Sequence, residues 1–273
     1  YSSILLNSWS IKSHSLSSII SFNWILLSII ALISKTPNLS VFRSCSKISL
    51  QSNVKLCICI SSTIELIKFL KLNNIKYKVI GRGSNLIFVN EVYDGVLIKL
   101  DNFDYLEING NEITVGAGFQ LIKLATRLSR MGYTGMEFAT GIPGSVGGAV
   151  FMNAGAYKSD MGYIVKSAKV LTPNLRIIEL TNYDLDFHYR TSFLQKNPGF
   201  ICLEVSLILK KGDPEEIMQL INDRKKRRIE SQPLEYPSAG SVFRNPEGDF
   251  AGRLIEEAGY KGKTKGGAMV STK

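Results

Sequence analysis

The sequence predicts an α+β fold. Short stretches that alternate apolar and polar side chains, as strands do, recur between Tyr77 and Lys210. Two amphipathic segments have helical spacing, and a separate helical stretch follows the last predicted strand, from Asp213 onward. The chain has 273 residues, 45% of them hydrophobic, which is enough to bury a core in one large domain or two smaller ones.

The first sixty residues differ in composition from the rest. From Tyr1 to Ser62 there is no Asp, Glu or Gly, and the chain does not begin with Met. The most apolar run, Ile19–Ile33, has 15 residues, fewer than the roughly 18–20 that cross a bilayer. It could also be a signal-peptide core, but no small-residue cleavage site follows closely. We expect residues 1–52 to be an atypical segment of a longer reading frame or a translated fragment.

Regular patterns begin near Ser61. The segment Thr63–Asn73 places apolar residues at helical spacing and carries Glu65 in its first turn, which predicts a helix. Tyr77–Ile80 is typical of a short strand, and it runs into the segment GRGSNLIF, which begins at Gly81. A strand followed by Gly-x-Gly suggests a phosphate loop, but Leu86 stands where GxGxxG has its third glycine, which argues against a Rossmann site.

Two further strands and a second helix come next. Gly95–Leu100 and Glu112–Val115 alternate as strands do, and Asn109–Asn111 between them is typical of a turn. Leu121–Arg130 is amphipathic and is reached through Gly116–Gly118, which predicts a helix after a glycine turn.

The central stretch Gly141–Tyr157, GIPGSVGGAVFMNAGAY, is rich in glycine but contains apolar anchors such as Val146 and Phe151. Flexible linkers lack such anchors, so ordered backbone packed tightly against another element is expected. Glycine lets backbone N–H groups approach a ligand, and successive N–H groups can bind a phosphate or diphosphate. A crowded turn between helix and sheet would need the same glycines, and the stretch alone favours that simpler interpretation.

The second half of the chain predicts a hairpin, a strand and a helix. Ala168–Leu171 and Arg176–Leu180 flank a turn at Pro173, and Ile201–Lys210 alternates as a long strand. Asp213-Pro-Glu-Glu is a good helix start, with Pro in the first helical position and acidic residues in the first turn. The helix should run through the basic run Arg224–Arg228 and end before Pro233.

The net charge and the cysteines restrict the possible functions only partly. The formal charge of +10 is compatible with nucleic acid, a membrane or an acidic small ligand. Arg224–Arg228, RKKRR, is typical of a solvated helix face and could also help to collect a diphosphate. The 4 cysteines lack zinc spacing, and the 2 histidines lie too far apart for a metal site, so we expect reduced thiols and no metal.

Four motifs in order carry a family resemblance: GRGSNLIF (Gly81–Phe88), the central glycine stretch, YRTSF (Tyr189–Phe193) and YPSAGSVFRNP (Tyr236–Pro246). From about Ser61 to Lys273 the chain resembles the UDP-N-acetylenolpyruvoylglucosamine reductases, in their shorter subtype. These flavoenzymes make the UDP-N-acetylmuramate precursor of bacterial peptidoglycan. The resemblance implies noncovalent FAD, NADPH as co-substrate, a UDP-sugar substrate and a monomer in the bacterial cytoplasm, without nucleic-acid or membrane partners.

The resemblance also implies the domains. A two-part FAD-binding domain of the vanillyl-alcohol-oxidase (PCMH) type would span residues 53–211, and a partial α+β substrate-binding domain would span residues 212–273. An Ile-Gly-Gly-like turn expected near the N-terminus is not found in residues 1–62. A catalytic glutamate expected late in the substrate domain is not found either. Glu256 and Glu257 do not fit its motif, so we expect the chain to end before it.

Site residues follow from the matching motifs. Arg190 is implied as the cation beside the substrate carboxylate, and Ser241 as the acid that protonates the carbanion. The residues implied for the cofactor are Gly81, Gly83, Ser84, Asn85, Gly141, Ile142, Pro143, Gly144, Ser145, Gly147, Gly148, Ala149 and Asn153. Those implied for the substrate are Tyr189, Arg228 and Asn245.

Three alternatives stay open at this point. The chain could be an inactive flavin-binding remnant, or another FAD-dependent oxidoreductase of the same fold that acts on an alcohol or a lactone. AGSVFRNP argues against the second. A nucleic-acid-binding protein built around Arg224–Arg228 is the third, and the lack of aromatic residues within that run argues against it.

Overall fold

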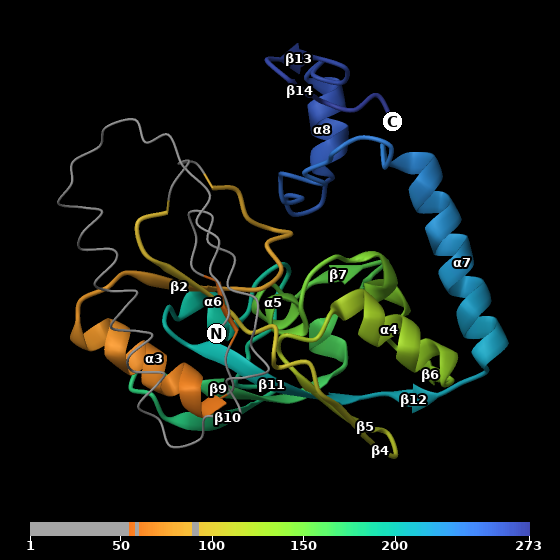
Figure 1. The fold of residues 1–273 in the computed structure, drawn as a ribbon. Coiled ribbons are helices and arrows are strands. Elements are labelled where there is room, and N and C mark those ends of the chain that lie inside the picture. Colours follow the sequence, from red (N-terminus) through yellow and green to blue (C-terminus); the bar gives the residue numbers. More distant parts are fainter. Residues whose placement is uncertain (1–54, 58–59, 89–92) are drawn as a thin grey trace, which may run out of the picture. The chain divides into compact units, whose positions relative to one another are not determined.

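The computed structural model describes residues 55–57, 60–88 and 93–273 (Figure 1). Every described residue belongs to one compact unit, which begins after residue 48. The predicted N-terminal segment, residues 1–52, lies outside the described residues. The mixture of helices and strands confirms the predicted α+β class.

A small parallel sheet leads into the first glycine motif. Its strands run in the order β1 (Lys55–Cys57), β3 (Val96–Lys99), β2 (Tyr77–Ile80). Helix α3 (Ile60–Leu72) connects β1 to β2 and buries Leu66, Ile67 and Leu70. Parallel strands need such a crossover because a tight turn can join only antiparallel ones. Since Gly81 directly follows β2, the sheet presents the GRGS segment at the end of a strand.

A five-stranded antiparallel sheet forms the main core. Its order is β10 (Ile177–Thr181), β9 (Val165–Leu171), β11 (Ile201–Ile208), β5 (Glu112–Gly116), β4 (Leu106–Asn109). The central strand β11 buries Val205 and Leu207 completely, and leaves Ser206 between them half-buried. This alternation places one face of the sheet against the buried core.

The elements that carry the central glycines follow β5. They are α4 (Leu121–Arg130), the 3-10 helix η1 (Glu137–Gly141) and α5 (Val146–Phe151). Helix α4 buries Leu121, Leu124 and Leu128 along one stripe, as an amphipathic helix should. The buried Glu137 carboxylate accepts hydrogen bonds from the Thr134 hydroxyl (2.6 Å) and the Gly135 N–H (2.9 Å). These bonds fix the start of η1 and therefore the approach to Gly141.

Short elements complete the unit. Two-stranded pairs are β6 (Tyr133–Thr134) with β12 (Lys210–Lys211), β7 (Gly155–Ala156) with β8 (Ser159–Asp160), and β13 (Thr264–Lys265) with β14 (Ala268–Met269). The helices are η2 (Met161–Tyr163), α6 (Phe193–Lys196), α7 (Pro214–Ser231) and α8 (Ala251–Glu257). Within the described part of the chain, no helix is long and apolar enough to cross a membrane.

The predicted elements agree with the structure where the pattern is local. Tyr77–Ile80 and Leu121–Arg130 are confirmed with the bounds that the sequence predicts. The predicted strand Ile201–Lys210 is too long. It ends at Ile208, because Lys210 and Lys211 pair with β6 instead of with the main sheet.

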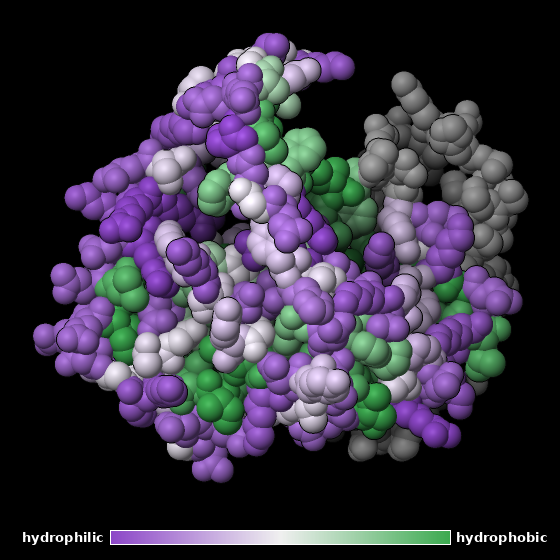
Figure 2. Space-filling model, turned by 180° about the vertical axis from the view of Figure 1, so that it is seen from behind, coloured by the Kyte–Doolittle hydropathy of each residue, from purple (hydrophilic) through white to green (hydrophobic). Residues whose placement is uncertain are grey.

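One face of the molecule and one cysteine can be compared with the predictions of a globular protein and of reduced thiols. The face drawn in Figure 2 is mainly hydrophilic, with apolar side chains in separate patches. Cys202 is buried and free, and burial raises the pKa of its thiol to about 12, which keeps the thiol protonated.

Helix α7 begins as the sequence predicts. The Asp213 carboxylate accepts hydrogen bonds from the N–H groups of Glu215 (2.7 Å) and Glu216 (3.2 Å), and Pro214 fills the first helical position. We expect Asp213→Ala to lower the free energy of unfolding by about 1 kcal/mol, because two helix donors lose their acceptor. Urea denaturation measures this. Asp223→Ala, an exposed acid in mid-helix, is the matched control, and an equal loss there would contradict the capping role.

Candidate active site

The two predicted glycine motifs lie against each other. The Ser84 hydroxyl donates a hydrogen bond to the Pro143 carbonyl (2.9 Å). A Cβ at Gly81 would lie 2.6 Å from the Ser145 Oγ, and a Cβ at Gly144 would lie 3.3 Å from the Ser84 Oγ. We call residues 81–84 together with residues 141–148 the glycine cradle. Its two halves come from separate parts of the chain, one after the parallel sheet and one between η1 and α5.

The glycine cradle contains two glycines with left-handed backbone, and one of them, Gly83, has no side chain near it. Gly83 (φ 80°) and Gly144 (φ 143°) occupy the left-handed half of backbone space, where side chains are strained. The position of a Cβ at Gly83 is open, with no atom within 4 Å. A ligand can therefore reach the backbone here without displacing a side chain, which fits the diphosphate of a dinucleotide cofactor.

The end of the cradle is fixed by the core. The buried Ser145 caps α5 by accepting a hydrogen bond from the Gly148 N–H (3.3 Å). The Gly147 N–H donates to the Ala117 carbonyl (2.8 Å), and a Cβ at Gly147 would lie 2.8 Å from the Ala117 Cβ. Ser145 and Gly147 thus set the position of the cradle. Ile142 packs against the buried core, and Ala149 is itself buried.

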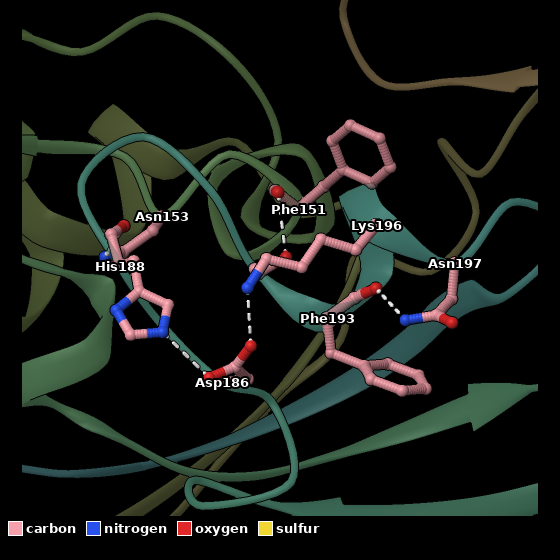
Figure 3. A network of polar contacts seen from close by, with 8 residues as sticks. Phe151, Asn153, Asp186, His188, Phe193, Lys196 and Asn197 are labelled. Carbon is pink, nitrogen blue, oxygen red and sulfur yellow. Dashed lines mark hydrogen bonds and ion pairs between the residues drawn. The ribbon is translucent and has the colours of Figure 1, made fainter.

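Asn153 lies just after the cradle and is 2% exposed, with a left-handed backbone (φ 42°). Its amide nitrogen donates to the carbonyl of His188, which lies beside it in Figure 3 (2.8 Å). Its amide oxygen accepts from the Gly162 N–H (2.9 Å). The family resemblance assigns Asn153 to the cofactor. In the structure it ties the segment before YRTSF to the glycine stretch.

Arg190 sits in a two-residue turn. His188 and Thr191 exchange backbone hydrogen bonds of 3.1 Å on either side of it, and Arg190 itself is left-handed (φ 56°). Its guanidinium donates to the Gly155 carbonyl (2.6 Å) and lies 5.2 Å from the centroid of the Tyr189 ring. Among the described residues Arg190 has no acidic partner, so its positive charge is not neutralised by an ion pair and can serve an anionic ligand.

A polar network supports this turn. Asp186 accepts a hydrogen bond from the Lys196 ammonium (2.5 Å) and is paired with His188 Nε2 (2.9 Å). The Ser192 hydroxyl donates to the Phe151 carbonyl at the end of α5 (2.8 Å). The sequence does not reveal these contacts, because they join side chains that belong to no shared motif.

The network yields a titration prediction. Lys196 first, and His188 second, hold the pKa of Asp186 below its ordinary 3.8. The stabilisation is therefore present above pH 3.8 and is lost as the pH falls through the lower, folded pKa. We expect Lys196→Ala to move the Asp186 midpoint upward, towards 3.8, in a carboxyl NMR titration.

Asp184 provides the control for that titration. Its pKa is also lowered, but by hydrogen bonds from Thr181, so Lys196→Ala should not move its midpoint. An unchanged Asp186 midpoint in the variant would contradict the network.

A cavity of about 770 Å³ opens beside the Arg190 turn. Two predicted site residues, Asn153 and Tyr189, line it together with Asp160, Gly162, Tyr163, Asn182, Tyr183, Asp184, Asp186, Phe187 and His188. Tyr189 is 53% exposed, so its ring is available to a ligand in the cavity as well as to Arg190. The described residues contain no cluster of three or more His, Cys, Asp or Glu side chains suited to a metal ion.

Two predicted site residues lie in the loop between α7 and α8. Ser241 is exposed there, and no hydrogen bond within the described part of the chain joins it to Arg190. The Asn245 amide oxygen accepts a hydrogen bond from the Ala251 N–H at the start of α8 (3.1 Å). The structure therefore places Asn245 in a local structural contact and leaves the Ser241 hydroxyl open to solvent.

Two arginines link this part of the chain to the site. Arg244, the residue before Asn245, donates to the Gln195 amide oxygen (3.3 Å), close to the YRTSF segment. Arg228, on α7, donates to the Gly141 carbonyl in the glycine cradle. The sequence predicts Arg228 as a substrate contact, and the structure bonds it to the cradle backbone. Arg244 lies within the YPSAGSVFRNP motif but is not among the predicted site residues.

Comparison with known proteins agrees with this geometry. The family model for an FAD binding domain matches residues 57–181, and the model for the C-terminal domain of UDP-N-acetylenolpyruvoylglucosamine reductase matches residues 232–273. The chain is 52% identical over 206 residues to a UDP-N-acetylenolpyruvoylglucosamine reductase of Halalkalibacterium halodurans, covering 75% of this chain and 68% of that protein. It is 48% identical over 217 residues to the Bacillus subtilis protein of the same name, covering 78% and 72%.

A solved structure shows the same similarity. The crystal structure of UDP-N-acetylenolpyruvylglucosamine reductase from Thermus caldophilus aligns with a TM-score of 0.68 and 32% identity, covering 85% of this chain and 83% of that one. The predicted FAD-binding fold is confirmed by this similarity and by the matching family model. The chain belongs to the UDP-N-acetylenolpyruvoylglucosamine reductase family.

Proposed function

We propose that the chain is an FAD-dependent oxidoreductase that uses NADPH to reduce the enolpyruvyl group of UDP-N-acetylglucosamine enolpyruvate, giving UDP-N-acetylmuramate. The observation that carries this proposal is the junction of the glycine cradle with the Arg190 turn. The Arg190 guanidinium is bonded to the Gly155 carbonyl, in the same glycine stretch that forms half of the cradle. One backbone stretch therefore carries half of the proposed cofactor site and the carbonyl that holds Arg190, the proposed carboxylate-binding cation.

The glycine cradle fits FAD. Gly83 leaves the backbone open to a ligand, and Ser84 and Asn85 add polar side chains in the same loop. FAD, when bound, accepts a hydride from NADPH and delivers it to the enolpyruvyl double bond. No His or Cys lies in the cradle, which supports noncovalent binding.

Arg190 would hold the substrate carboxylate. Reduction of an enolpyruvyl group places negative charge on the carbon beside the carboxylate, and a fixed cation stabilises that charge. A guanidinium stays charged at any working pH and can grip a carboxylate with two N–H groups. The hydrogen bond to Gly155 uses only part of its donor set, so donors remain for the substrate.

Ser241 would supply the proton. The carbanion needs an acid at the carbon that does not receive the hydride, and a positioned hydroxyl can provide it when its neighbours polarise it. Asn245 and Tyr189 are proposed contacts of the UDP-sugar, and Asn245 also stabilises the start of α8.

The wider assignment is part of the same proposal. We place the boundary between the FAD-binding and substrate-binding domains at residues 211 and 212, directly before the Asp213 cap of α7. We also propose that the enzyme works as a monomer in the bacterial cytoplasm, without a nucleic-acid partner. The half-buried positions of Arg224 and Arg228 support the absence of nucleic acid, because they take two cations of the basic run away from the exposed surface.

A coupled assay tests the proposed function. The purified chain should release FAD on acid denaturation, and it should oxidise NADPH only when the UDP-enolpyruvyl sugar is present. UDP-N-acetylglucosamine, which lacks the double bond, is the control substrate. FAD release without sugar-dependent NADPH oxidation would favour the inactive flavin-binding protein instead.

A further inference from the structure

The basic run of α7 is divided by the helical period. Arg224 and Arg228, four residues apart, are half-buried, whereas Lys225, Lys226 and Arg227 are exposed. Residues at this spacing share one face of a helix. The face that carries Arg224 and Arg228 therefore differs from the solvated face that carries the other cations.

Arg228 is directed at the start of the glycine stretch. Its Nη1 donates to the Gly141 carbonyl, and a Cβ at Gly141 would lie 2.5 Å from that same nitrogen. A guanidinium bonded to a carbonyl is a charge-assisted contact, stronger than a neutral hydrogen bond. The approach is close enough that a larger residue at position 141 would push the arginine away.

Arg224 is directed at the other end of the same stretch. Its guanidinium lies 4.6 Å from the centroid of the Tyr157 ring, and the Tyr157 hydroxyl donates to the Arg224 carbonyl (3.2 Å). Tyr157 (φ 54°) and Lys158 (φ 60°) are both left-handed, a conformation that costs free energy for residues with a side chain. The pairing of β7 with β8 closes this turn, because Gly155 pairs with Asp160 and Ala156 with Ser159. The two contacts with Tyr157 attach the closed turn to Arg224 on α7.

We propose that Arg224 and Arg228 are positioning residues, which together form a latch from α7 to both ends of the Gly141–Tyr157 stretch. The latch holds half of the glycine cradle, and also the Gly155 carbonyl that accepts from Arg190. Because α7 is the first helix of the proposed substrate-binding domain, the latch couples that domain to the FAD site. The expected effect of the latch on FAD affinity rests on the proposed function. Its expected effect on the order of the Gly141–Tyr157 backbone does not.

Hydrogen exchange and FAD titration together test the latch. The double variant Arg224→Ala/Arg228→Ala should lose exchange protection across residues 141–157 in the FAD-free protein. It should also bind FAD about tenfold to a hundredfold more weakly, the range expected for losing a charged hydrogen bond. Lys225→Ala/Arg227→Ala removes the same charge from the same helix and should change neither quantity.

Single variants keep the test decisive if the double variant fails to fold. Arg228→Lys retains the charge and one donor nitrogen, so it should lose less FAD affinity than Arg228→Ala. It should also keep part of the visible circular dichroism of the bound flavin. Tyr157→Phe removes only the hydroxyl, so it should raise exchange near residue 157 and leave exchange near residue 141 unchanged.

Two results would overturn the latch. One is an equal effect of the control pair, which would make the effect one of net charge. The other is unchanged exchange and FAD affinity with a raised KM for the UDP-sugar, which would mean that the arginines bind the substrate directly. A parent protein that binds no FAD would contradict the proposed function, while the exchange measurement would still decide the latch.

Discussion

Replacing Ser241 with alanine should slow the reduction of the UDP-enolpyruvyl sugar by about 10²–10⁴-fold, the range for losing a general acid. FAD affinity and the reduction of the flavin by NADPH should stay near the parent values, because neither needs this proton. The structure supports such a separation, since Ser241 lies in the exposed loop between α7 and α8 and has no hydrogen bond to the glycine cradle among the described contacts.

Rapid-mixing absorbance follows the two half-reactions of this variant separately. Ser238→Ala is the control, because the Ser238 hydroxyl accepts from the Gly240 N–H (3.1 Å) and shapes the same loop. If both variants slow equally, loop geometry and not proton donation explains the loss. If the reduced flavin of Ser241→Ala is reoxidised by the UDP-enolpyruvyl sugar at the parent rate, the serine is structural. A slower flavin reduction would instead place Ser241 at the cofactor or NADPH site.

Arg190→Ala should weaken substrate capture as well as rate, because the guanidinium meets the carboxylate before and during the reaction. We expect kcat/KM to fall by about 10²–10³-fold, the size of losing one preorganised electrostatic group. Steady-state kinetics with varied UDP-sugar give KM and kcat separately, and KM should rise while kcat falls.

Two further variants distinguish the charge of Arg190 from its hydrogen bond to the Gly155 carbonyl. Arg190→Gln keeps an N–H donor but carries no charge, so it should resemble the alanine variant. Arg190→Lys keeps the charge but loses the two-pronged grip, so it should fall between them and the parent. Parent-like kinetics in Arg190→Gln would show that the arginine serves only to hold Gly155.

Local sequence patterns predict the elements around the site well. The helix Leu121–Arg130 follows from its apolar spacing, and the start of α7 follows from Asp213 and Pro214. Both depend on side chains within a few residues of each other, so no tertiary information is needed. The apolar anchors of the glycine stretch likewise predict ordered backbone, and Ser145 caps a short helix inside it.

The contacts that assemble the site cannot be read from the sequence. Ser84 meets Pro143, and Arg228 meets Gly141, across long separations in the chain. The resemblance assigns Asn153 to the cofactor but does not reveal that its amide bonds to His188 and Gly162 in the buried interior. Such pairings depend on how the sheets and helices pack, and no local pattern encodes them.

Anaerobic mixing of the FAD-loaded protein tests the central claim most directly. NADPH should bleach the visible absorbance of the flavin, and the UDP-enolpyruvyl sugar added afterwards should restore it as UDP-N-acetylmuramate forms. UDP-N-acetylglucosamine should leave the flavin bleached. If the enolpyruvyl sugar restores the absorbance no faster than that control, the chain is not a reductase of this substrate.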